Sequence, residues 1–344
     1  MKFINLYTTA ALVSTGILAT AIEPQGSDET YRREADAFLS NLPARLQEKQ
    51  AEAIRMAISG TCEPLEAIRN SRNISQQLPA GITRTYVSDN LALFRDTHHD
   101  NDTLPLLIYF HGGGWTIGSI NSCSQFCAAM ALNGIAVLAV DYRFAPEHRY
   151  PDGLNDCIAA VRTAASNLDK WKCSGISLGG DSSGGNLAIA TAMSFPEDTF
   201  NSMVTFYPVT KAYPDNSSSW TEFGTGFGLD SELMEVFNEA YTSDIRNPLV
   251  SPADADDAEL KNLPPTLIVA AERDILRDQG IEFANRLVKL GIKVEHRLIP
   301  NSVHLFITVP GQAASFSHAV SVSSEFIHSN RNAVETSISR TNTE

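Results

Sequence analysis

Short, uninterrupted apolar runs recur along this chain, and longer stretches with helical spacing separate them. A strand is apolar along its whole length when both faces of its sheet are covered, as in parallel α/β sheets. The alternation therefore predicts an α/β fold with a mostly parallel central sheet and helices on both faces. The continuous runs are residues 104–110, 135–140, 203–209 and 266–271, and residues 173–178 and 294–299 are also predicted as strands. The predicted helices between the strands are 122–133, 153–167, 184–194 and 278–290.

The chain before the first of these runs has a different pattern. Residues 82–88 and 91–95 alternate polar and apolar side chains around a two-residue turn, which predicts a β-hairpin. Residues 27–59 have helical spacing that Pro43 interrupts and that resumes at 51–58, which predicts helices on either side of the proline.

Residues 213–242 also depart from the alternation, because they are rich in Ser, Gly and aromatic residues and become helical only at 231–240. We interpret them as an insertion over the carboxyl-terminal edge of the sheet that forms a lid together with the N-terminal helices. The predicted organisation is a signal peptide (1–21), N-terminal cap helices and lead-in (22–80), a catalytic domain (81–330) with a cap insertion at about 211–245, and a C-terminal tail (331–344).

The N-terminus has the features of a secretory signal peptide. Met1 and Lys2 form a short positive start, residues 3–21 carry no charged side chain, and the stretch ends in Ala-Thr-Ala. This pattern predicts cleavage near Ala21/Ile22 and a secreted or periplasmic protein with no stable membrane anchor after cleavage. A membrane anchor is the alternative, but polar residues interrupt the apolar run and disfavour a span.

The overall charge and the cysteines limit the classes of partner. The formal net charge is −14, and nucleic-acid binding needs a basic face, so the sequence argues against a nucleic-acid partner. The five cysteines cannot all pair within the chain, and they show no C-x-x-C or Cys/His spacing typical of a metal site. We therefore predict no metal site, while the oligomeric state and any disulfide pairing stay open.

A Gly-x-Ser-x-Gly pattern centred on Ser182 lies between a predicted strand and a predicted helix. A serine at such a sharp turn exposes its hydroxyl, and small neighbours allow the strained backbone. The pattern alone is weak, because glycine-rich turns also serve as plain architecture or as phosphate-binding loops. A catalytic interpretation therefore needs a base, an acid and an oxyanion site elsewhere in the chain.

The oxyanion site is predicted directly after the strand 104–110, since sites in open α/β sheets form beyond the carboxyl ends of the strands. Gly112, Gly113 and Gly114 follow that strand, and three glycines can turn their N–H groups inward without side-chain obstruction. Together with the N–H of Ser183, they are predicted to hold the oxyanion of a tetrahedral intermediate. A flexible surface loop is the alternative, which the position beside a core strand disfavours.

The remaining catalytic residues follow two later strands. Asp274 comes after the run 266–271, and His304 comes after 294–299. The chain order Ser182, Asp274, His304 is the order of an α/β-hydrolase triad, in which the histidine takes the serine proton and the aspartate fixes the imidazole tautomer. A single Asp or His in a loop is usually a surface or capping residue, so the prediction depends on all the elements occurring at strand ends in this order.

At this point the sequence resembles the hormone-sensitive-lipase-like α/β-hydrolase esterases, called family IV among bacterial enzymes. The similarity extends from about residue 79 to residue 327, and the motifs together are highly specific. The matching motifs are His111-Gly-Gly-Gly-Trp115, Asp141-Tyr-Arg-Phe-Ala-Pro-Glu147, Gly180-Asp-Ser-Ser-Gly-Gly185, Asp274-Ile-Leu-Arg-Asp278 and His304-Leu-Phe306. The resemblance implies the α/β-hydrolase fold with a helical cap, the triad and oxyanion hole named above, and Asp274 rather than Asp278 as the acid. Ser183 stands where alanine is commoner in the family, and we expect little effect on activity because the backbone N–H, not the side chain, binds the oxyanion. We interpret residues 141–147 as structural, bracing the oxyanion loop.

These features predict a serine carboxylesterase that hydrolyses short-chain acyl esters through an acyl-enzyme, with a small-molecule ester as its partner and no cofactor. An amidase, a deacetylase or a lipase on the same triad is the alternative, as is a non-catalytic binding protein of the hydrolase fold, which the presence of His304 disfavours. Trp115 and Tyr207 are plausible walls of the acyl pocket, although aromatic residues beside a strand end more often pack in the core.

Overall fold

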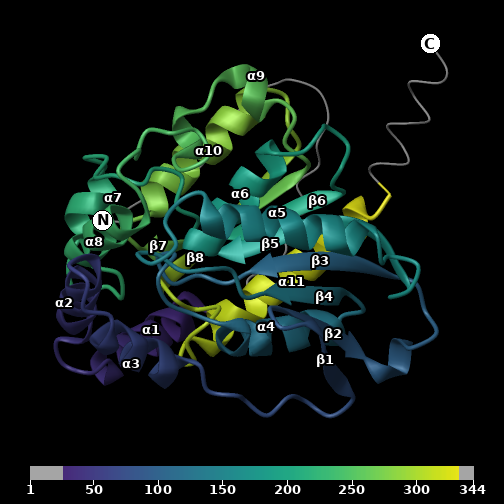
Figure 1. Ribbon diagram of the computed structural model, residues 1–344, viewed down its shortest axis with the longest axis horizontal. Coiled ribbons are helices and arrows are strands. Elements are labelled where there is room, and N and C mark those ends of the chain that lie inside the picture. The colour runs from purple at the N-terminus through teal and green to yellow at the C-terminus, as the bar shows by residue number, and fades with distance from the viewer. Residues whose placement is uncertain (1–25, 333–344) are drawn as a thin grey trace, which may run out of the picture.

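A single eight-stranded sheet runs through the part of the chain that the computed structural model describes, residues 26–332 (Figure 1). The predicted signal peptide, its cleavage site and nearly all of the predicted C-terminal tail lie outside these residues. The strands are β1 (Ile82–Ser88), β2 (Leu91–Asp96), β3 (Leu104–Phe110), β4 (Ala136–Val140), β5 (Cys173–Asp181), β6 (Ser202–Phe206), β7 (Thr266–Arg273) and β8 (Val294–Val303).

The strand order across the sheet is β1-β2-β4-β3-β5-β6-β7-β8. The β1–β2 hairpin and the β2–β4 pair are antiparallel, and all other neighbours pair in parallel. The prediction of a mostly parallel sheet with an N-terminal hairpin is therefore confirmed. Because β3 to β8 are parallel, their carboxyl ends lie at one edge of the sheet, where the predicted site residues follow them.

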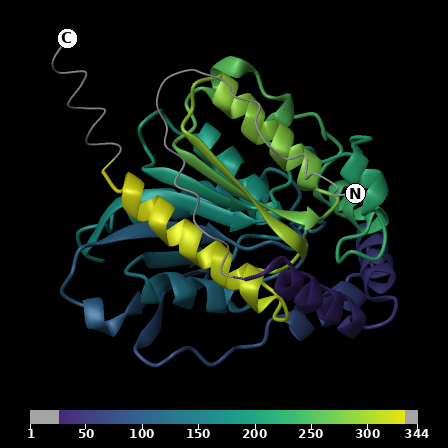
Figure 2. The ribbon, with the colours of Figure 1, turned by 180° about the vertical axis from the view of Figure 1, so that it is seen from behind.

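Helices cover both faces of this sheet (Figures 1 and 2). Helices α4 and α11 pack on one face, and α5, α6 and α10 pack on the other. The helices are α1 (Asp28–Asn41), α2 (Leu46–Ile58), α3 (Glu63–Arg72), α4 (Ile120–Leu132), α5 (Asp152–Ala165), α6 (Ser183–Met193), α7 (Ser218–Glu222), α8 (Ser231–Tyr241), α9 (Asp257–Leu260), α10 (Arg277–Lys289) and α11 (Ala313–Asn330), with single 3-10 turns at Thr97–His99 and Pro252–Asp254.

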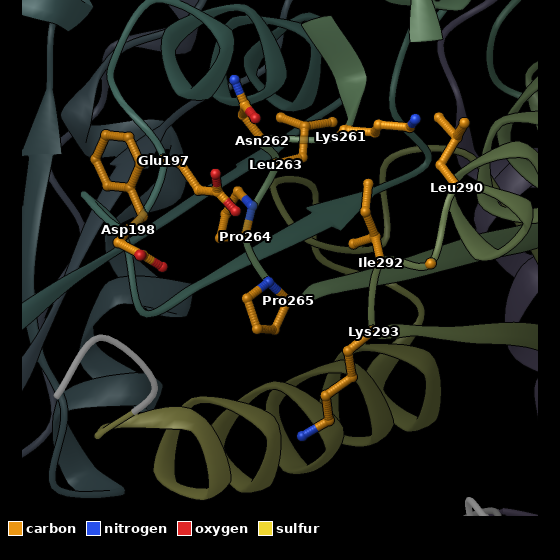
Figure 3. Close-up of a pocket in the computed structure, with 12 residues that line it drawn as sticks. Glu197, Asp198, Lys261, Asn262, Leu263, Pro264, Pro265, Leu290, Ile292 and Lys293 are labelled. Carbon is orange, nitrogen blue, oxygen red and sulfur yellow. The ribbon is translucent and has the colours of Figure 1, made fainter. Parts of the chain in front are cut away.

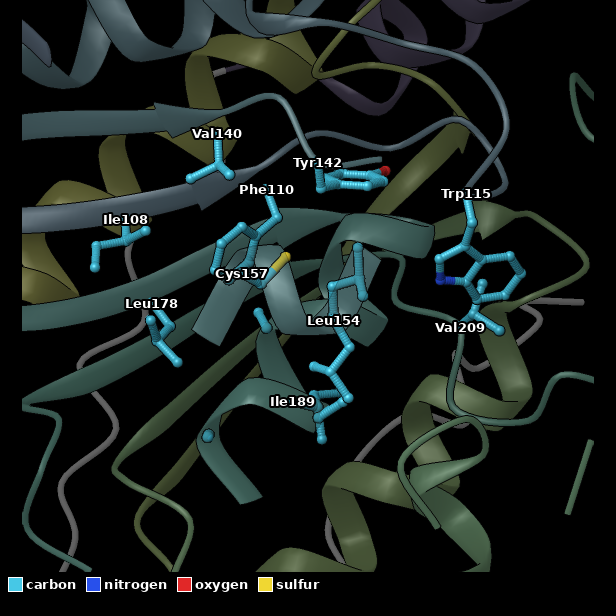
Figure 4. Close-up of a cluster of buried hydrophobic side chains, with 14 of the residues drawn as sticks. Ile108, Phe110, Trp115, Val140, Tyr142, Leu154, Cys157, Leu178, Ile189 and Val209 are labelled. Carbon is cyan, nitrogen blue, oxygen red and sulfur yellow. The ribbon is translucent and has the colours of Figure 1, made fainter. Parts of the chain in front are cut away.

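Strand geometry explains why the apolar runs are continuous. Successive side chains of a strand point to opposite faces, so Ile108 and Phe110 of β3 belong to the core under α5 and α6, whereas Leu107 and Tyr109 belong to the core under α4 and α11. Figure 4 shows the first of these cores, where β3 meets Leu154 of α5. Burying such a side chain fully stabilises the fold by about 1.5–3 kcal/mol.

The structure differs from the sequence-based prediction at several elements, including β6, α2, α3 and α11. Strand β6 ends at Phe206, not at 209, because Tyr207 has a φ of 35° that a strand cannot contain. Helix α2 begins at Leu46, a full turn before the predicted restart at 51. Helices α3 and α11 were not predicted: Leu65 is the one buried side chain of α3, and the buried face of α11 includes several serines and a histidine.

The N-terminal helices and the insertion lie side by side at one end of the molecule (Figure 1). Helix α2 packs against α8, where Arg55 pairs with Glu232 at 2.9 Å, and α1 packs against β8 and α11. These contacts are those expected of a shared cap, although the domain boundaries themselves stay a prediction. Within residues 26–332, no helix has the length and apolar character to span a bilayer.

Candidate active site

Ser182 forms the turn between β5 and α6. Its φ of 55° and ψ of −119° lie outside the helical and strand regions, which is the strained conformation that the motif predicts. Two backbone hydrogen bonds hold the turn: the Ser182 N–H donates to the carbonyl of Phe206 (2.9 Å), and the Ser182 carbonyl accepts from the N–H of Val209 (3.2 Å). The hydroxyl is thereby fixed at the carboxyl edge of the sheet.

The structure brings the three predicted triad residues together. His304 Nε2 lies 3.1 Å from Ser182 Oγ, and His304 Nδ1 lies 2.6 Å from Asp274 Oδ2. The exposed fractions of Ser182, Asp274 and His304 are 7%, 1% and 2%. A carboxylate can only accept hydrogen bonds, so Asp274 places the imidazole proton on Nδ1 and leaves the Nε2 lone pair facing the Ser182 hydroxyl.

Two buried side chains, Gln312 and Tyr207, contact the His304 segment, and the sequence predicted this role for neither of them. Gln312, 1% exposed, accepts from the Val303 N–H (3.0 Å) and donates to the carbonyls of Val303 (3.2 Å) and His304 (3.1 Å). The Tyr207 ring packs 4.3 Å from the His304 ring, and its hydroxyl accepts from the N–H of Ile307 (3.2 Å). Tyr207, predicted as a pocket wall, therefore packs against the proposed base.

The predicted oxyanion donors divide into two groups. Among the described residues, the N–H groups of Gly113 and Gly114 have no acceptor, and Ser183 is the first residue of α6, where a helical N–H has no intrahelical acceptor. These three donors are free to bind an oxyanion. Gly114 has a φ of 59°, and a side chain there would run into the ring of Phe237, so glycine is required at this position.

Gly112 corrects the prediction. Its N–H donates to Oδ1 of the buried Asp181 at 3.0 Å, so it is not available as an oxyanion donor. The same oxygen accepts from the hydroxyl of Tyr109 (2.8 Å). Burial raises the pKa of Asp181 above its ordinary value, against the lowering effect of these hydrogen bonds. Asp181 is therefore an anchor that ties the oxyanion loop to the strand carrying Ser182.

Trp115 lies in the core beside this loop. It is 1% exposed, and its ring stacks on that of Tyr241 of α8, with centroids 4.4 Å apart and planes inclined by 3°. Figure 4 shows the indole and Val209 as members of the same buried cluster. In this structure the ring packs against helix α8, and its contact with an acyl group stays a prediction.

The segment 141–147 contacts the oxyanion loop at two points. The N–H of Ala145 donates to the carbonyl of Trp115 (3.0 Å), and the hydroxyl of Tyr142 donates to the carbonyl of His111 (2.8 Å). The rings of Tyr142 and His111 also stack at 4.6 Å. These contacts agree with the interpretation of this segment as a brace.

Two of the larger cavities lie at different distances from this site: one is remote from it and the other borders it. One of about 450 Å³ lies among the segments that lead into β6, β7 and β8 (Figure 3). These strands begin at the edge of the sheet opposite to Ser182, which follows the end of β5. Another of about 380 Å³ borders the loop that follows His304, between Phe306 and Ser317, and includes Gln125 of α4.

Across the described part of the chain, no cluster of three or more His, Cys, Asp or Glu side chains is placed to hold a metal ion.

Comparisons with known proteins agree with this architecture. Residues 107–308 match a family model described as the alpha/beta hydrolase fold. The chain is 34% identical over 217 residues to an alpha/beta hydrolase of Acanthamoeba polyphaga mimivirus, covering 60% of this chain and 62% of that protein. It is 34% identical over 243 residues to the carboxylesterase NlhH of Mycobacterium tuberculosis, covering 66% of this chain and 75% of that protein.

A similar solved structure is carboxyl esterase 2 of the fungus Tuber melanosporum. It is 27% identical in sequence, with a TM-score of 0.67, and the match covers 74% of this chain and 88% of that one. The match thus spans less than two thirds of the viral relative's length, and more than two thirds of the length of each of the two esterases.

Proposed function

The chain belongs to the hormone-sensitive-lipase-like α/β hydrolases, and from this premise we propose that it is a serine carboxylesterase of small acyl esters. The observation that carries the proposal is the hydrogen-bonded series Ser182–His304–Asp274, with distances of 3.1 and 2.6 Å, beside three N–H groups that have no acceptor among the described residues. Relatives named as carboxylesterases support the reaction class.

In the proposed acylation step, Ser182 Oγ attacks the ester carbonyl carbon while its proton passes to His304 Nε2. The carbonyl oxygen becomes an oxyanion, and the resulting imidazolium is stabilised by Asp274. The His304 proton then passes to the leaving alkoxide as the C–O bond breaks. The alcohol is released, and the acyl group remains bound to Ser182 as an ester. A water activated by His304 hydrolyses that ester, releasing the acid and restoring the serine.

The oxyanion of both tetrahedral intermediates would bind to the N–H groups of Gly113, Gly114 and Ser183. Such donors stabilise charge that develops only on the way to the intermediate, and removing one costs about 10²- to 10³-fold in kcat. No metal or organic cofactor is needed, since the nucleophile, base and oxyanion donors all come from the chain.

The surroundings of Ser182 favour a short acyl group. Ser182 is 7% exposed, and Phe237 of the cap helix α8, 6% exposed, lies directly against Gly114. A bulky acyl chain beside the oxyanion donors would have to displace this ring, whereas an acetyl or butyryl group is far smaller.

Purified protein should therefore hydrolyse p-nitrophenyl esters, with the highest kcat/KM at acetate or butyrate. Ser182→Ala should lose the activity, and the neighbouring Ser183→Ala is the matched control that should retain it. Equal turnover by wild type and Ser182→Ala would refute the catalytic proposal, and a maximum at long chains would refute the short-acyl part of it.

We also propose that the protein is secreted or periplasmic, on the basis of the signal-peptide pattern in residues 1–21. Mass spectrometry of the exported protein should give an N-terminus near Ile22. An intact Met1 on the native protein would contradict this proposal.

A further inference from the structure

The turn that carries the free oxyanion donors has an uncommon backbone. Gly113, Gly114 and Trp115 have φ values of 126°, 59° and 57°, so three successive residues lie in the region with positive φ. A non-glycine residue there is strained by of the order of 1–3 kcal/mol, and such a conformation persists only where its surroundings fix it. The groups that hold this turn therefore decide whether the oxyanion hole exists.

One of these groups is Arg69, which belongs to α3 of the N-terminal segment. Its Nε donates to the carbonyl of Thr116 at 2.8 Å, and its Nη2 donates to the carbonyl of Ala145 at 2.9 Å. Nη1 and Nη2 bind the two carboxylate oxygens of Glu147, each at 2.8 Å, and the guanidinium lies 5.3 Å from the ring centre of Phe144. The Arg69 side chain is 17% exposed, so one guanidinium joins two backbone segments in a mostly buried place.

The hydrogen bond from Arg69 to Thr116 affects the oxyanion donors through the peptide that joins Gly113 to Gly114. The N–H groups of Thr116 and Ile117 both donate to the carbonyl of Gly113, at 3.1 and 3.0 Å. This carbonyl and the N–H of Gly114 belong to the same trans peptide, in which they point in opposite directions. With its carbonyl held inside the turn, the peptide must direct the Gly114 N–H out of the turn.

We propose that Arg69 is a positioning residue of the oxyanion hole: it fixes the Gly113–Thr116 turn from the cap and so orients the Gly114 N–H. This inference rests on the proposed esterase function. The planar fork of arginine satisfies Thr116, Ala145 and Glu147 together, which the point charge of a lysine cannot do. The cap then contributes to transition-state stabilisation as well as covering the site.

Three variants separate this role from general support of the fold. Arg69→Met removes all four hydrogen bonds; Glu147→Gln removes the charge pair but leaves both backbone contacts of Arg69; and Arg55→Met removes the α2–α8 ion pair, which does not touch the oxyanion turn. We expect Arg69→Met to lower kcat for p-nitrophenyl acetate by about 10- to 100-fold with KM within about threefold, since small displacements of catalytic groups cost up to about 10²-fold. The two controls should keep kcat within about twofold.

A trifluoromethyl ketone provides the second measurement, because its adduct with Ser182 places an oxyanion in the hole. Its inhibition constant should rise in Arg69→Met by the same factor by which kcat/KM falls, and should stay unchanged in Glu147→Gln. Arg69→Lys should behave like Arg69→Met, and it keeps the test decisive if Arg69→Met does not fold.

Wild-type kcat in Arg69→Met or Arg69→Lys, or an equal loss in Glu147→Gln, would overturn the positioning role. If instead the wild type shows no Ser182-dependent turnover and does not bind the ketone, the esterase proposal itself fails. The two failures are therefore distinguishable.

Discussion

Replacing Asp274 with asparagine tests the proposed triad through one atom. Asp274 Oδ2 faces His304 Nδ1 at 2.6 Å, and Oδ1 accepts from the N–H of Leu276 at 3.0 Å. Asparagine has a single oxygen for these two donors. When that oxygen stays on the Leu276 N–H, the amide NH₂ faces Nδ1 and forces the imidazole proton onto Nε2, where the ring can no longer accept a proton from Ser182.

The size of the effect follows from this change of tautomer. Asp274 is 1% exposed, so water cannot replace the lost acceptor. The equivalent substitution in a serine-protease triad lowers kcat by about 10⁴-fold, which corresponds to about 5.4 kcal/mol in the activation barrier. We expect a loss of this order for Asp274→Asn, with KM within about threefold because the carboxylate does not touch the substrate.

Asp278 provides the matched control, because it is the second aspartate of the same motif and lies four residues away. Its Oδ2 accepts from the N–H of Ser219, and its Oδ1 accepts from Arg277. Burial would raise the pKa of Asp278, but these hydrogen bonds outweigh it and hold the pKa below its ordinary value. Asp278→Asn should therefore lower stability at neutral pH, a difference that is lost as the pH falls through the folded-state pKa, and should keep kcat within about twofold.

The assay is steady-state hydrolysis of p-nitrophenyl acetate by both variants, with labelling of Ser182 by a fluorophosphonate as a second readout. Asp274→Asn should be labelled far more slowly than wild type, and Asp278→Asn at the wild-type rate. A larger loss in Asp278→Asn than in Asp274→Asn would show that the acid has been assigned to the wrong residue.

Substitutions at three other positions separate the roles of backbone, space and charge. Ser183→Ala should keep kcat within about twofold, because its N–H and not its hydroxyl is the donor; a tenfold loss would contradict this. Gly114→Ala should lower kcat by at least about 100-fold, since the methyl group would collide with Phe237 and displace an oxyanion donor, and unchanged kinetics would remove Gly114 from the site. Asp181→Asn should raise the melting temperature at pH 7.5, because burial raises the pKa of Asp181 and the ionised form destabilises the fold above that pKa. The gain in melting temperature should shrink toward pH 4, as the wild-type carboxyl becomes protonated. A gain that grows on acidification would contradict this reasoning.

The fold could be predicted from the sequence because burial on both faces leaves a strong local signal. Strands β3, β4, β6 and β7 contain continuous apolar runs, and their two sets of side chains enter separate cores, whereas β8 carries Glu295, His296 and Arg297. Helix α11 left no such signal, since its buried face includes Ser315, His318 and Ser323, whose packing against the sheet depends on tertiary context. Strand β6 was predicted too long because the apolar run continues past Phe206, while the backbone turns at Tyr207.

The site was predictable where chemistry follows chain order and unpredictable where it depends on a dihedral angle. Ser182, Asp274 and His304 each follow a predicted strand, so their convergence at one edge of the sheet could be expected. Three successive glycines look alike in the sequence, however, and only the backbone conformation shows that the first N–H donates to Asp181. Arg69 gave no signal, because it lies on a helix with a single buried side chain and acts on a carbonyl 47 residues away.

The N-terminal helices contact the segments that carry the proposed base and the oxyanion donors, which bears on what a cap formed by these helices does. Phe38 of α1 packs in one apolar cluster with Val303, the residue before the base. Gln47 of α2 accepts from the N–H of Asp230, in the insertion loop that passes over His304, and Arg69 of α3 holds the oxyanion turn. A lid that only admitted or excluded substrates would alter KM when its contacts are weakened. A cap that fixes both the base and the oxyanion donors must alter kcat as well, because the groups that act in the transition state then depend on it for their position.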